Sequence, residues 1–343
     1  MKAGIWEGGG TISCGEVEQP QPGAGELLVE IAYCGVCGTD LHILDGKFDV
    51  GPPPQVLGHE ASGVVVAGGP ETDPELIGRA VGLNPIGPCG VCVWCRAGHP
   101  THCRNPYYSA SAYAEYALYR PQQLFPLPAG VSLPGAALLE PWATALRAAE
   151  AARLRAGENV LVIGGGSLGL LVASAARVLG AATVTVSEPR RRNRELALAR
   201  GATAAVDSAE ADLAALAAAT GELRGFDVVF EVAGATAALE QAPALLRRGG
   251  RLVVLGVFGA EVTVPVAPTQ LTDRELTILG SFGGGGSFGR AASLLSAVDA
   301  ASLVTAVEPL AGIAELFGRI RAGEEIKGMI QPGRGESVGA QQA

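Results

Sequence analysis

The run VLVIGGGSLGLL, residues 160–171, decides the fold of this chain, because it leads from a short apolar strand through a glycine turn into a helix. The turn matches the pattern G-x-G-x-x-G, whose glycines let the backbone approach a pyrophosphate. The helix that follows offers free N–H groups and a dipole that attract such an anion. We therefore expect a dinucleotide to bind at Gly164, Gly166, Ser167, Leu168 and Gly169.

The next predicted strand ends on an acidic residue that fits this interpretation. Glu188 lies about 20 residues beyond the glycine turn, where a carboxylate accepts hydrogen bonds from the hydroxyls of a ribose. The same carboxylate repels a 2′-phosphate, so NAD is favoured over NADP. Arg190, Arg191 and Arg192 follow directly and would bind that phosphate, which keeps NADP possible.

The order of predicted elements indicates an α/β fold. Strand-like and helix-like runs alternate from residue 160 to residue 259, which predicts a parallel doubly wound sheet. Residues 1 to about 130 hold short strands separated by glycine and proline, and residues 134–154 predict one helix. The glycine run at 280–290 is expected to be a flexible connection.

Composition excludes several classes of protein. The 343 residues carry a net charge of −9 and only three lysines, so no basic patch is available for nucleic acid. The N-terminus has no apolar run of signal-peptide length. Residues 159–176 are uncharged, but their pattern fits strand, turn and helix better than a membrane span. We expect a cytoplasmic protein that binds neither nucleic acid nor membrane.

Four of the seven cysteines fall in one short stretch, CGVCVWCRAGHPTHC, residues 89–103. Disulfides are rare in a reducing cytoplasm, and a redox pair would need a single C-x-x-C beside a βαβ unit. Four thiolates in one loop suit a closed tetrahedral zinc site, although an iron–sulfur cluster uses the same ligands. We predict structural zinc at Cys89, Cys92, Cys95 and Cys103, with His99 and His102 outside the ligand shell.

A second group of chemically suited residues lies in CGVCGTDLH, residues 34–42, and GHE, residues 58–60. Cys37, His59 and Glu60 suit a metal with an open coordination position. Thr39 and His42 place a hydroxyl and an imidazole three residues apart, which would form a path for a proton. These residues predict a catalytic metal site separate from the four-cysteine lobe.

With these motifs and with EPWATA (140–145) and GGRLVVLG (249–256), the chain resembles the zinc-dependent medium-chain alcohol/polyol dehydrogenases across nearly all of residues 1–332. The resemblance implies a GroES-like β-rich catalytic domain, residues 1–144 and 285–343, interrupted by a Rossmann domain, residues 145–284. It also implies that Cys37, His59 and Glu60 surround the catalytic zinc. Thr39 would then bond the substrate oxygen and His42 would relay the proton.

One departure points to a branch of this family. Simple alcohol dehydrogenases supply a later cysteine ligand, whereas this chain has no cysteine after Cys103 and carries Glu140 at the matching place. That resembles the sorbitol, threonine and butanediol dehydrogenase branch, where a glutamate sits beside the zinc directly or through water. A helix-start acid is the alternative interpretation of Glu140.

We therefore expect an enzyme that transfers a hydride between NAD(P) and a secondary alcohol such as a polyol, sugar alcohol, aminocyclitol or vicinal diol. Oxidation of an amino alcohol, as by L-threonine 3-dehydrogenase, is one alternative. A non-enzymatic Rossmann protein with structural zinc only is the other. The resemblance also implies a homodimer or homotetramer, joined at the apolar segment ELTILGSF, residues 275–282.

Overall fold

The computed structural model describes residues 1–221 and 223–333. These residues form two compact units. Unit 1 joins Met1–Ala143 to the chain from Gly285 on, and unit 2 is Thr144–Gly284. Residues 334–343, which the sequence prediction assigned to the catalytic domain, lie outside the described residues.

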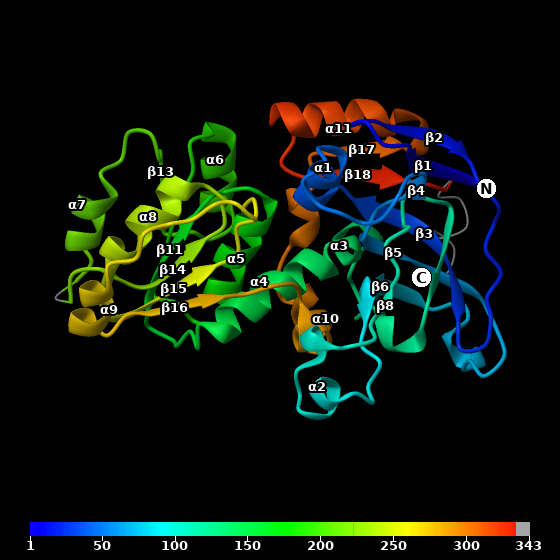
Figure 1. Ribbon diagram of the computed structural model, residues 1–343, viewed down its shortest axis with the longest axis horizontal. Coiled ribbons are helices and arrows are strands. Elements are labelled where there is room, and N and C mark those ends of the chain that lie inside the picture. The colour runs from blue at the N-terminus through cyan, green and yellow to red at the C-terminus, as the bar shows by residue number, and fades with distance from the viewer. Residues whose placement is uncertain (222, 334–343) are drawn as a thin grey trace. The chain divides into compact units, whose positions relative to one another are not determined.

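Unit 2, green to orange in Figure 1, is built around a six-stranded parallel sheet. The strand order is β13-β12-β11-β14-β15-β16, the order typical of a dinucleotide-binding fold. The predicted parallel doubly wound sheet is therefore confirmed. The elements are β11 (Asn159–Ile163), α5 (Ser167–Val178), β12 (Thr183–Ser187), α6 (Arg191–Ala199), β13 (Ala204–Val206), α7 (Leu213–Ala218), β14 (Phe226–Glu231), α8 (Thr236–Leu245), β15 (Leu246–Val254), α9 (Pro268–Arg274) and β16 (Thr277–Gly280).

The strand order reverses between β11 and β14, and this reversal fixes where a ligand can bind. Ligands of open parallel sheets occupy the crevice at such a point, beyond the carboxyl ends of the strands. The glycine turn follows β11 at this point. Gly164 has φ +105°, and a side chain at Gly169 would collide with the Gly164 carbonyl, so both positions need glycine.

Unit 1 is rich in short, mostly antiparallel strands, which form a seven-stranded sheet and two smaller ones. Its central pair, β3 and β5, aligns Gly35 with Glu60. The strands are β1 (Lys2–Trp6), β2 (Ile12–Glu16), β3 (Leu27–Gly35), β4 (Gln55–Val56), β5 (Glu60–Gly68), β6 (Ala80–Leu83), β7 (Ile86–Gly87), β8 (Tyr107–Tyr108), β9 (Tyr116–Tyr119), β10 (Leu124–Pro126), β17 (Ala306–Pro309) and β18 (Gly328–Gln331).

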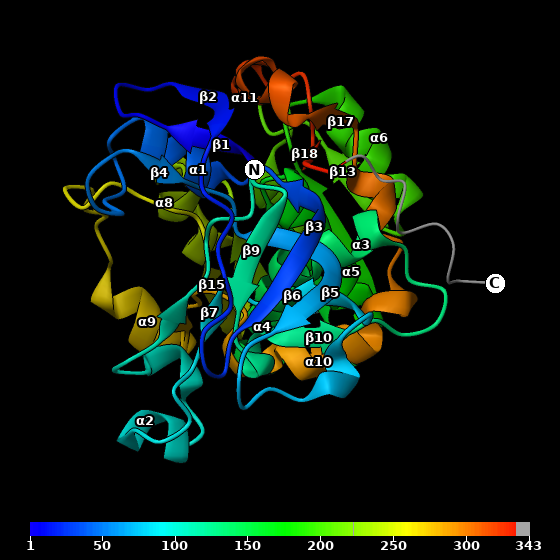
Figure 2. The same cartoon turned by 90° about the vertical axis from the view of Figure 1, so that its right-hand side faces the viewer.

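The helices of unit 1 are short. They are α1 (Gly38–Leu44), α2 (Val93–Arg96), α3 (Leu133–Ala137), α10 (Phe288–Leu294) and α11 (Ile313–Ala322). α2 lies in a lobe that stands apart from the strands of this unit in both views (Figure 1, Figure 2).

Two local predictions differ from the structure. The single helix expected over residues 134–154 is two helices. The first, α3, ends at its C-cap Leu138, and the second, α4 (Leu139–Ala151), begins directly after it. The glycine run expected to be a flexible connection instead runs into a short 3₁₀ turn at Gly285–Ser287 and then α10. The Trp142 indole donates to the Ala291 carbonyl at 3.0 Å, so α10 packs on the start of α4.

Within residues 1–221 and 223–333, the helices are all too short or too polar to span a lipid bilayer. The uncharged stretch 159–176 forms β11, the glycine turn and most of α5, as the sequence pattern predicted.

Candidate active site

The start of α1 and the start of β5 bring three predicted metal ligands together. Ligand atoms of Cys37, His59 and Glu60 all lie within 4.8 Å of one another. Cys37 is the N-cap of α1, directly after β3, and Glu60 opens β5, which pairs with β3. A thiolate, an imidazole and a carboxylate are the donors that zinc takes in proteins. The donor set therefore fits a zinc ion.

Asp40 supports this cluster, and the sequence analysis did not assign it a role. Its Oδ1 lies 3.3 Å from His59 Nδ1, and its Oδ2 accepts the Cys37 N–H at 2.9 Å and the Tyr113 hydroxyl at 2.7 Å. Asp40 is fully buried. A carboxylate behind a histidine ligand fixes the ring orientation and leaves Nε2 for the metal. The local signal was present, since an acid three residues after a helix N-cap is the capping-box position.

Opposite charges stabilise the contact between Asp40 and His59. Burial opposes ionisation of His59, but the charges of Asp40 and Cys37 outweigh it and hold the His59 pKa well above its usual range. Burial likewise opposes ionisation of Asp40, but His59 lowers the pKa of Asp40 below its ordinary value. Asp40 is therefore an anion that holds the His59 ring.

Cys34 and Cys37 form a C-x-x-C in sequence but occupy different environments. Cys34 is fully buried in the core of unit 1, where desolvation raises the pKa of its thiol well above the usual value. Cys37 is partly exposed at the helix start. A buried, protonated thiol is inert, so this pair does not have the character of a redox site.

Three further predicted catalytic residues are Thr39, His42 and Glu140, and Thr39 contacts the cluster of Cys37, His59 and Glu60. The Thr39 hydroxyl is 3.6 Å from Cys37 Sγ, and His42 lies in the last turn of α1. Among the described side chains, no hydrogen bond joins Thr39 to His42. Glu140 lies in the first turn of α4. Among the described residues, it is not part of the group of close ligand atoms from Cys37, His59 and Glu60.

Lys327 also contacts the cluster, and the sequence analysis missed it. Its ammonium donates to Glu60 Oε2 at 2.6 Å and to the Val36 carbonyl at 2.9 Å, with 2% of the side chain exposed. The only local signal was a lysine inside the apolar run IKGMI, residues 326–330.

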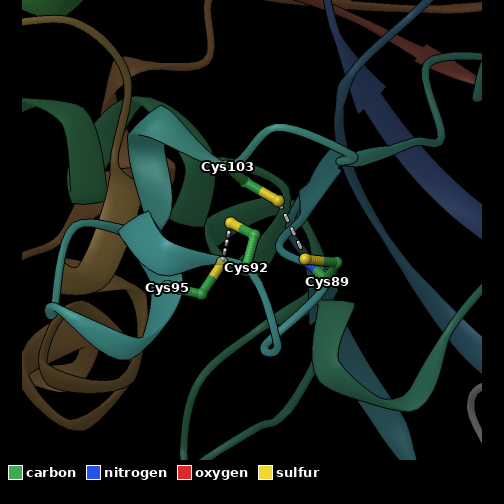
Figure 3. Close-up of side chains that lie close together, drawn as sticks. All are labelled: Cys89, Cys92, Cys95 and Cys103. Atoms are coloured by element: carbon green, nitrogen blue, oxygen red, sulfur yellow. Dashed lines mark hydrogen bonds between the residues drawn. The ribbon is translucent and has the colours of Figure 1, made fainter.

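The four remaining predicted ligands gather in the lobe around α2. Their sulfur atoms point toward one another (Figure 3) and lie within 4.8 Å of one another. Four zinc-bound thiolates would stand about 3.8 Å apart, given Zn–S bonds of about 2.3 Å. All seven cysteines are free thiols. Backbone hydrogen bonds from Arg104 and Cys95 lower the pKa of Cys92 to about 6, whereas burial and the neighbouring Cys92 raise the pKa of Cys95 to about 12, so Cys92 is the first of the two thiols to ionise.

The two histidines of this lobe lie beside the cysteine group. His99 and His102 are in edge contact with Trp94, with ring centroids 6.2 Å and 5.5 Å away. Among the described residues, neither histidine belongs to the group of ligand atoms, which consists of Cys89, Cys92, Cys95 and Cys103.

The glycine turn of unit 2 is arranged to receive an anion. Gly166 is the N-cap of α5 and provides no side-chain cap, so the first N–H groups of the helix, from Ser167 and Leu168 on, are available. Glu188 follows β12 and is buried. Its two oxygens accept the N–H groups of Gly165 at 2.8 Å and Arg190 at 2.9 Å. A carboxylate accepts up to about four hydrogen bonds, so capacity for a ribose remains.

Comparison with known proteins agrees with this arrangement. Residues 23–129 match the family model of the alcohol dehydrogenase GroES-like domain, and residues 167–297 match that of the zinc-binding dehydrogenases. The GroES-like fold expected for the β-rich unit is thus confirmed.

Three similar proteins are informative. The chain is 34% identical to 2-dehydro-3-deoxy-L-galactonate 5-dehydrogenase of Pseudoalteromonas atlantica, over 87% of this chain and 89% of the relative. It is 31% identical to sorbitol dehydrogenase of Bacillus subtilis, over 89% of each. A solved structure from Sinorhizobium meliloti, described as a zinc-binding dehydrogenase bound to NADP, superposes with a TM-score of 0.90 at 34% identity and covers 96% of this chain and 99% of that one.

The first family model spans both cysteine-containing clusters of unit 1, and the second begins within the glycine turn of unit 2. The chain therefore belongs to the zinc-dependent medium-chain alcohol/polyol dehydrogenase family, and it is an oxidoreductase that uses zinc and NAD(P).

Proposed function

We propose that this enzyme acts on secondary alcohols that carry a neighbouring oxygen, namely polyols, sugar alcohols, aminocyclitols or vicinal diols. The observation that carries the proposal is the cluster of Cys37, His59 and Glu60, backed by Asp40. It offers one thiolate where simple alcohol dehydrogenases offer two, with carboxylates nearby. The two curated relatives described above are named for polyhydroxylated substrates, which supports this class.

Each residue of the site has a proposed role. Cys37 and His59 would hold the catalytic zinc, with a carboxylate from Glu60 or Glu140 beside it. Zinc bound there supplies Lewis-acid polarisation of the substrate hydroxyl. Thr39 would accept the hydroxyl proton, and His42 would pass it toward solvent. A donor set rich in negative charge makes zinc a milder Lewis acid, which suits a substrate that gains a second contact from an adjacent oxygen.

In this proposal one unit binds the cofactor and the other binds the substrate and the zinc ions. Residues 145–284 would bind the cofactor, and residues 1–144 with 285–343 would hold the substrate and both zinc ions. NAD is the favoured cofactor in this proposal, because a carboxylate at Glu188 would accept hydrogen bonds from the ribose hydroxyls and repel a 2′-phosphate. The run Arg190–Arg192 keeps NADP as the second cofactor.

Assembly and location are part of the same proposal. β16 is an edge strand of the six-stranded sheet, and Ile278 and Phe282 beside that edge are exposed. Although β16 is only four residues long, exposed apolar side chains along a sheet edge favour pairing or covering of that edge. We therefore propose a homodimer formed at this edge, or a homotetramer of two such dimers. We also propose a cytoplasmic location, where the seven cysteines would remain reduced.

The function is tested by a turnover screen with NAD and NADP over polyols, sugar alcohols, aminocyclitols, vicinal diols, L-threonine and simple monoalcohols, together with metal analysis. The wild-type protein should contain about two zinc ions per chain and prefer diols. His59→Ala should lose one zinc and nearly all turnover. His99→Ala is the matched control, because it removes an imidazole from the lobe and should retain both zinc ions.

Two results would contradict the proposal. A wild-type protein with one zinc per chain and no turnover on the panel would favour a non-enzymatic protein with structural zinc only. Equal rates on monoalcohols and on diols would show that the substrate class is wrong while the family chemistry holds.

A further inference from the structure

Tyr113 lies in the core of unit 1, and its hydroxyl contacts the residues that support the metal site. The side chain is fully buried. The hydroxyl donates to Asp40 Oδ2 at 2.7 Å, and the Gly35 carbonyl lies 3.2 Å from the same hydroxyl. Gly35 ends β3 two residues before Cys37, and Asp40 lies in the first turn of α1. One hydroxyl therefore contacts the chain on both sides of Cys37.

The backbone at Tyr113 holds the segment that leads into His59. The Tyr113 N–H donates to the Leu57 carbonyl at 2.8 Å, and the Ala112 N–H donates to the Gly58 carbonyl at 3.0 Å. Gly58 has φ +100°, and a side chain at this position would collide with the Tyr113 backbone and ring. The Tyr113 ring therefore packs directly on the residue before His59.

The hydroxyl also completes the set of donors around the Asp40 carboxylate. Oδ2 accepts both the Tyr113 hydroxyl and the Cys37 N–H, while Oδ1 lies 3.3 Å from His59 Nδ1. Burial and the neighbouring Asp40 charge raise the Tyr113 pKa well above its usual value, so the hydroxyl keeps its proton and donates it. With Oδ2 held by two donors, the carboxylate cannot rotate without breaking a charge-assisted hydrogen bond, and Oδ1 stays directed at His59.

We propose that Tyr113 is a positioning residue of the catalytic metal site, whose hydroxyl fixes the Asp40 carboxylate and thereby the ring of His59. The inference rests on the proposed metal site, because it assigns to Tyr113 an effect on the metal through Asp40. Without the hydroxyl, Asp40 Oδ2 keeps only the Cys37 N–H, and the carboxylate is freer to turn away from His59. The metal should then be held less tightly, although every ligand is still present.

The test uses the full-length protein with cobalt in the catalytic site and zinc in the four-cysteine lobe, because loss of the visible absorption of cobalt reports its release to a chelator. Tyr113→Phe keeps the ring and removes only the hydroxyl. Cobalt release from this variant should be about tenfold faster than from the wild type, a size typical of groups that orient a metal ligand.

Tyr119→Phe is the matched control. Tyr119 is also a buried tyrosine of the unit 1 core, and within residues 1–221 and 223–333 its hydroxyl has no hydrogen-bond partner. Removing this hydroxyl should leave the release rate unchanged. If Tyr113→Phe folds and releases cobalt at the wild-type rate, whatever its melting temperature, the inference is overturned. An equal acceleration in Tyr119→Phe would also overturn it, because general loosening of the core would then explain the effect.

A second background tests whether Tyr113 acts through Asp40. In Asp40→Asn the acceptor is a neutral amide, and hydrogen bonds to neutral groups are about half as strong as those to charged groups. The effect of Tyr113→Phe on cobalt release should therefore shrink to about threefold in this background. An effect of undiminished size would overturn the inference, because the hydroxyl would then act through another acceptor, such as the Gly35 carbonyl.

The outcome for the inference is separable from that for the proposed function. A wild-type protein that binds metal only in the four-cysteine lobe contradicts the proposed function. A wild-type protein with two metal ions and normal turnover, whose cobalt release does not depend on the Tyr113 hydroxyl, contradicts only the positioning role.

Discussion

Asp40 Oδ1 lies 3.3 Å from His59 Nδ1, and the same carboxylate accepts the Cys37 N–H at 2.9 Å. One buried anion therefore orients two of the proposed zinc ligands, which come from different strand ends. The contact with His59 involves Nδ1, so Nε2 is the ring nitrogen that remains for the proposed zinc.

Asp40→Asn should weaken the catalytic metal site without removing a ligand. The amide is neutral and no longer favours one ring orientation of His59, so zinc affinity or kcat should fall about ten- to a hundredfold. Chelator competition and steady-state kinetics would measure the change. Asp49→Asn is the control, since Asp49 is exposed and accepts a hydrogen bond from the N–H of Gly51 in a loop. Unchanged zinc retention in Asp40→Asn would contradict the supporting role.

Cys95→Ser should damage the lobe more than the chemistry. A hydroxyl does not replace a thiolate in a closed tetrahedral site, so one zinc per chain should be lost and the melting temperature should fall. Calorimetry and metal analysis would follow both effects, while kcat of the remaining folded protein should stay near the wild-type value. Cys14→Ser, at an exposed thiol outside the lobe, is the control. Full zinc content with an unchanged melting temperature would count against a structural zinc site.

Glu188→Gln should weaken NAD binding and improve the use of NADP. The amide loses the charge that strengthens hydrogen bonds to the ribose, a loss of about 1.5–3 kcal/mol, which is roughly ten- to a hundredfold in Kd. Fluorescence titration of the reduced cofactors would measure both affinities. Glu195→Gln, on the exposed side of α6, serves as the control. A wild-type preference for NADP would show that the ribose argument is wrong.

Ile278→Lys should disrupt the proposed dimer. A charge on the edge of β16 opposes pairing of two sheets, because the ammonium would be buried in the contact. Light scattering at micromolar concentration should show dimers or tetramers for the wild type and smaller species for the variant. Val307→Lys, which changes an exposed valine in β17 of unit 1, is the control. A monomeric wild-type protein would contradict the assembly.

The contribution of Glu231 to stability should fall as the pH rises above about 4.3, the usual pKa of a glutamate in an unfolded chain. Glu231 ends β14 and is fully buried, and burial raises its pKa although backbone N–H groups oppose the shift. A carboxyl with a raised folded pKa holds its proton more tightly in the folded state. Its contribution is therefore greatest below the unfolded pKa and declines until the pH passes the folded pKa.

Glu231→Gln should remove this part of the pH dependence. Urea midpoints of the wild type and the variant are compared across pH 4 to 7, and the wild-type midpoint should fall relative to the variant midpoint as the pH rises. Glu240→Gln, at an exposed position on α8, should leave the slope unchanged. Parallel profiles for wild type and Glu231→Gln would show that the buried carboxyl does not titrate in this range.

The sequence by itself determined the parts whose chemistry is local. The turn from Gly164 to Gly169 was recognisable because a tight turn, a close backbone approach and a helix start all require residues near one another in the chain. The four lobe cysteines were recognisable for the same reason, since fifteen residues supply a whole tetrahedral shell. Cys37, His59 and Glu60 fall in two short motifs, and their residue types alone indicated a metal.

Only the tertiary structure decided how the catalytic cluster is supported. In the sequence, Asp40 is an acid in the first turn of a helix, and nothing near it in the chain indicates its contact with His59. Lys327 is 267 positions from Glu60, and no pattern within either segment joins them. Their contact depends on the order β5-β3-β18, in which hydrogen-bonded strands lie about 5 Å apart however far apart they are in the chain. A buried charge needs a partner in space, and the sheet register decides which residue that partner is.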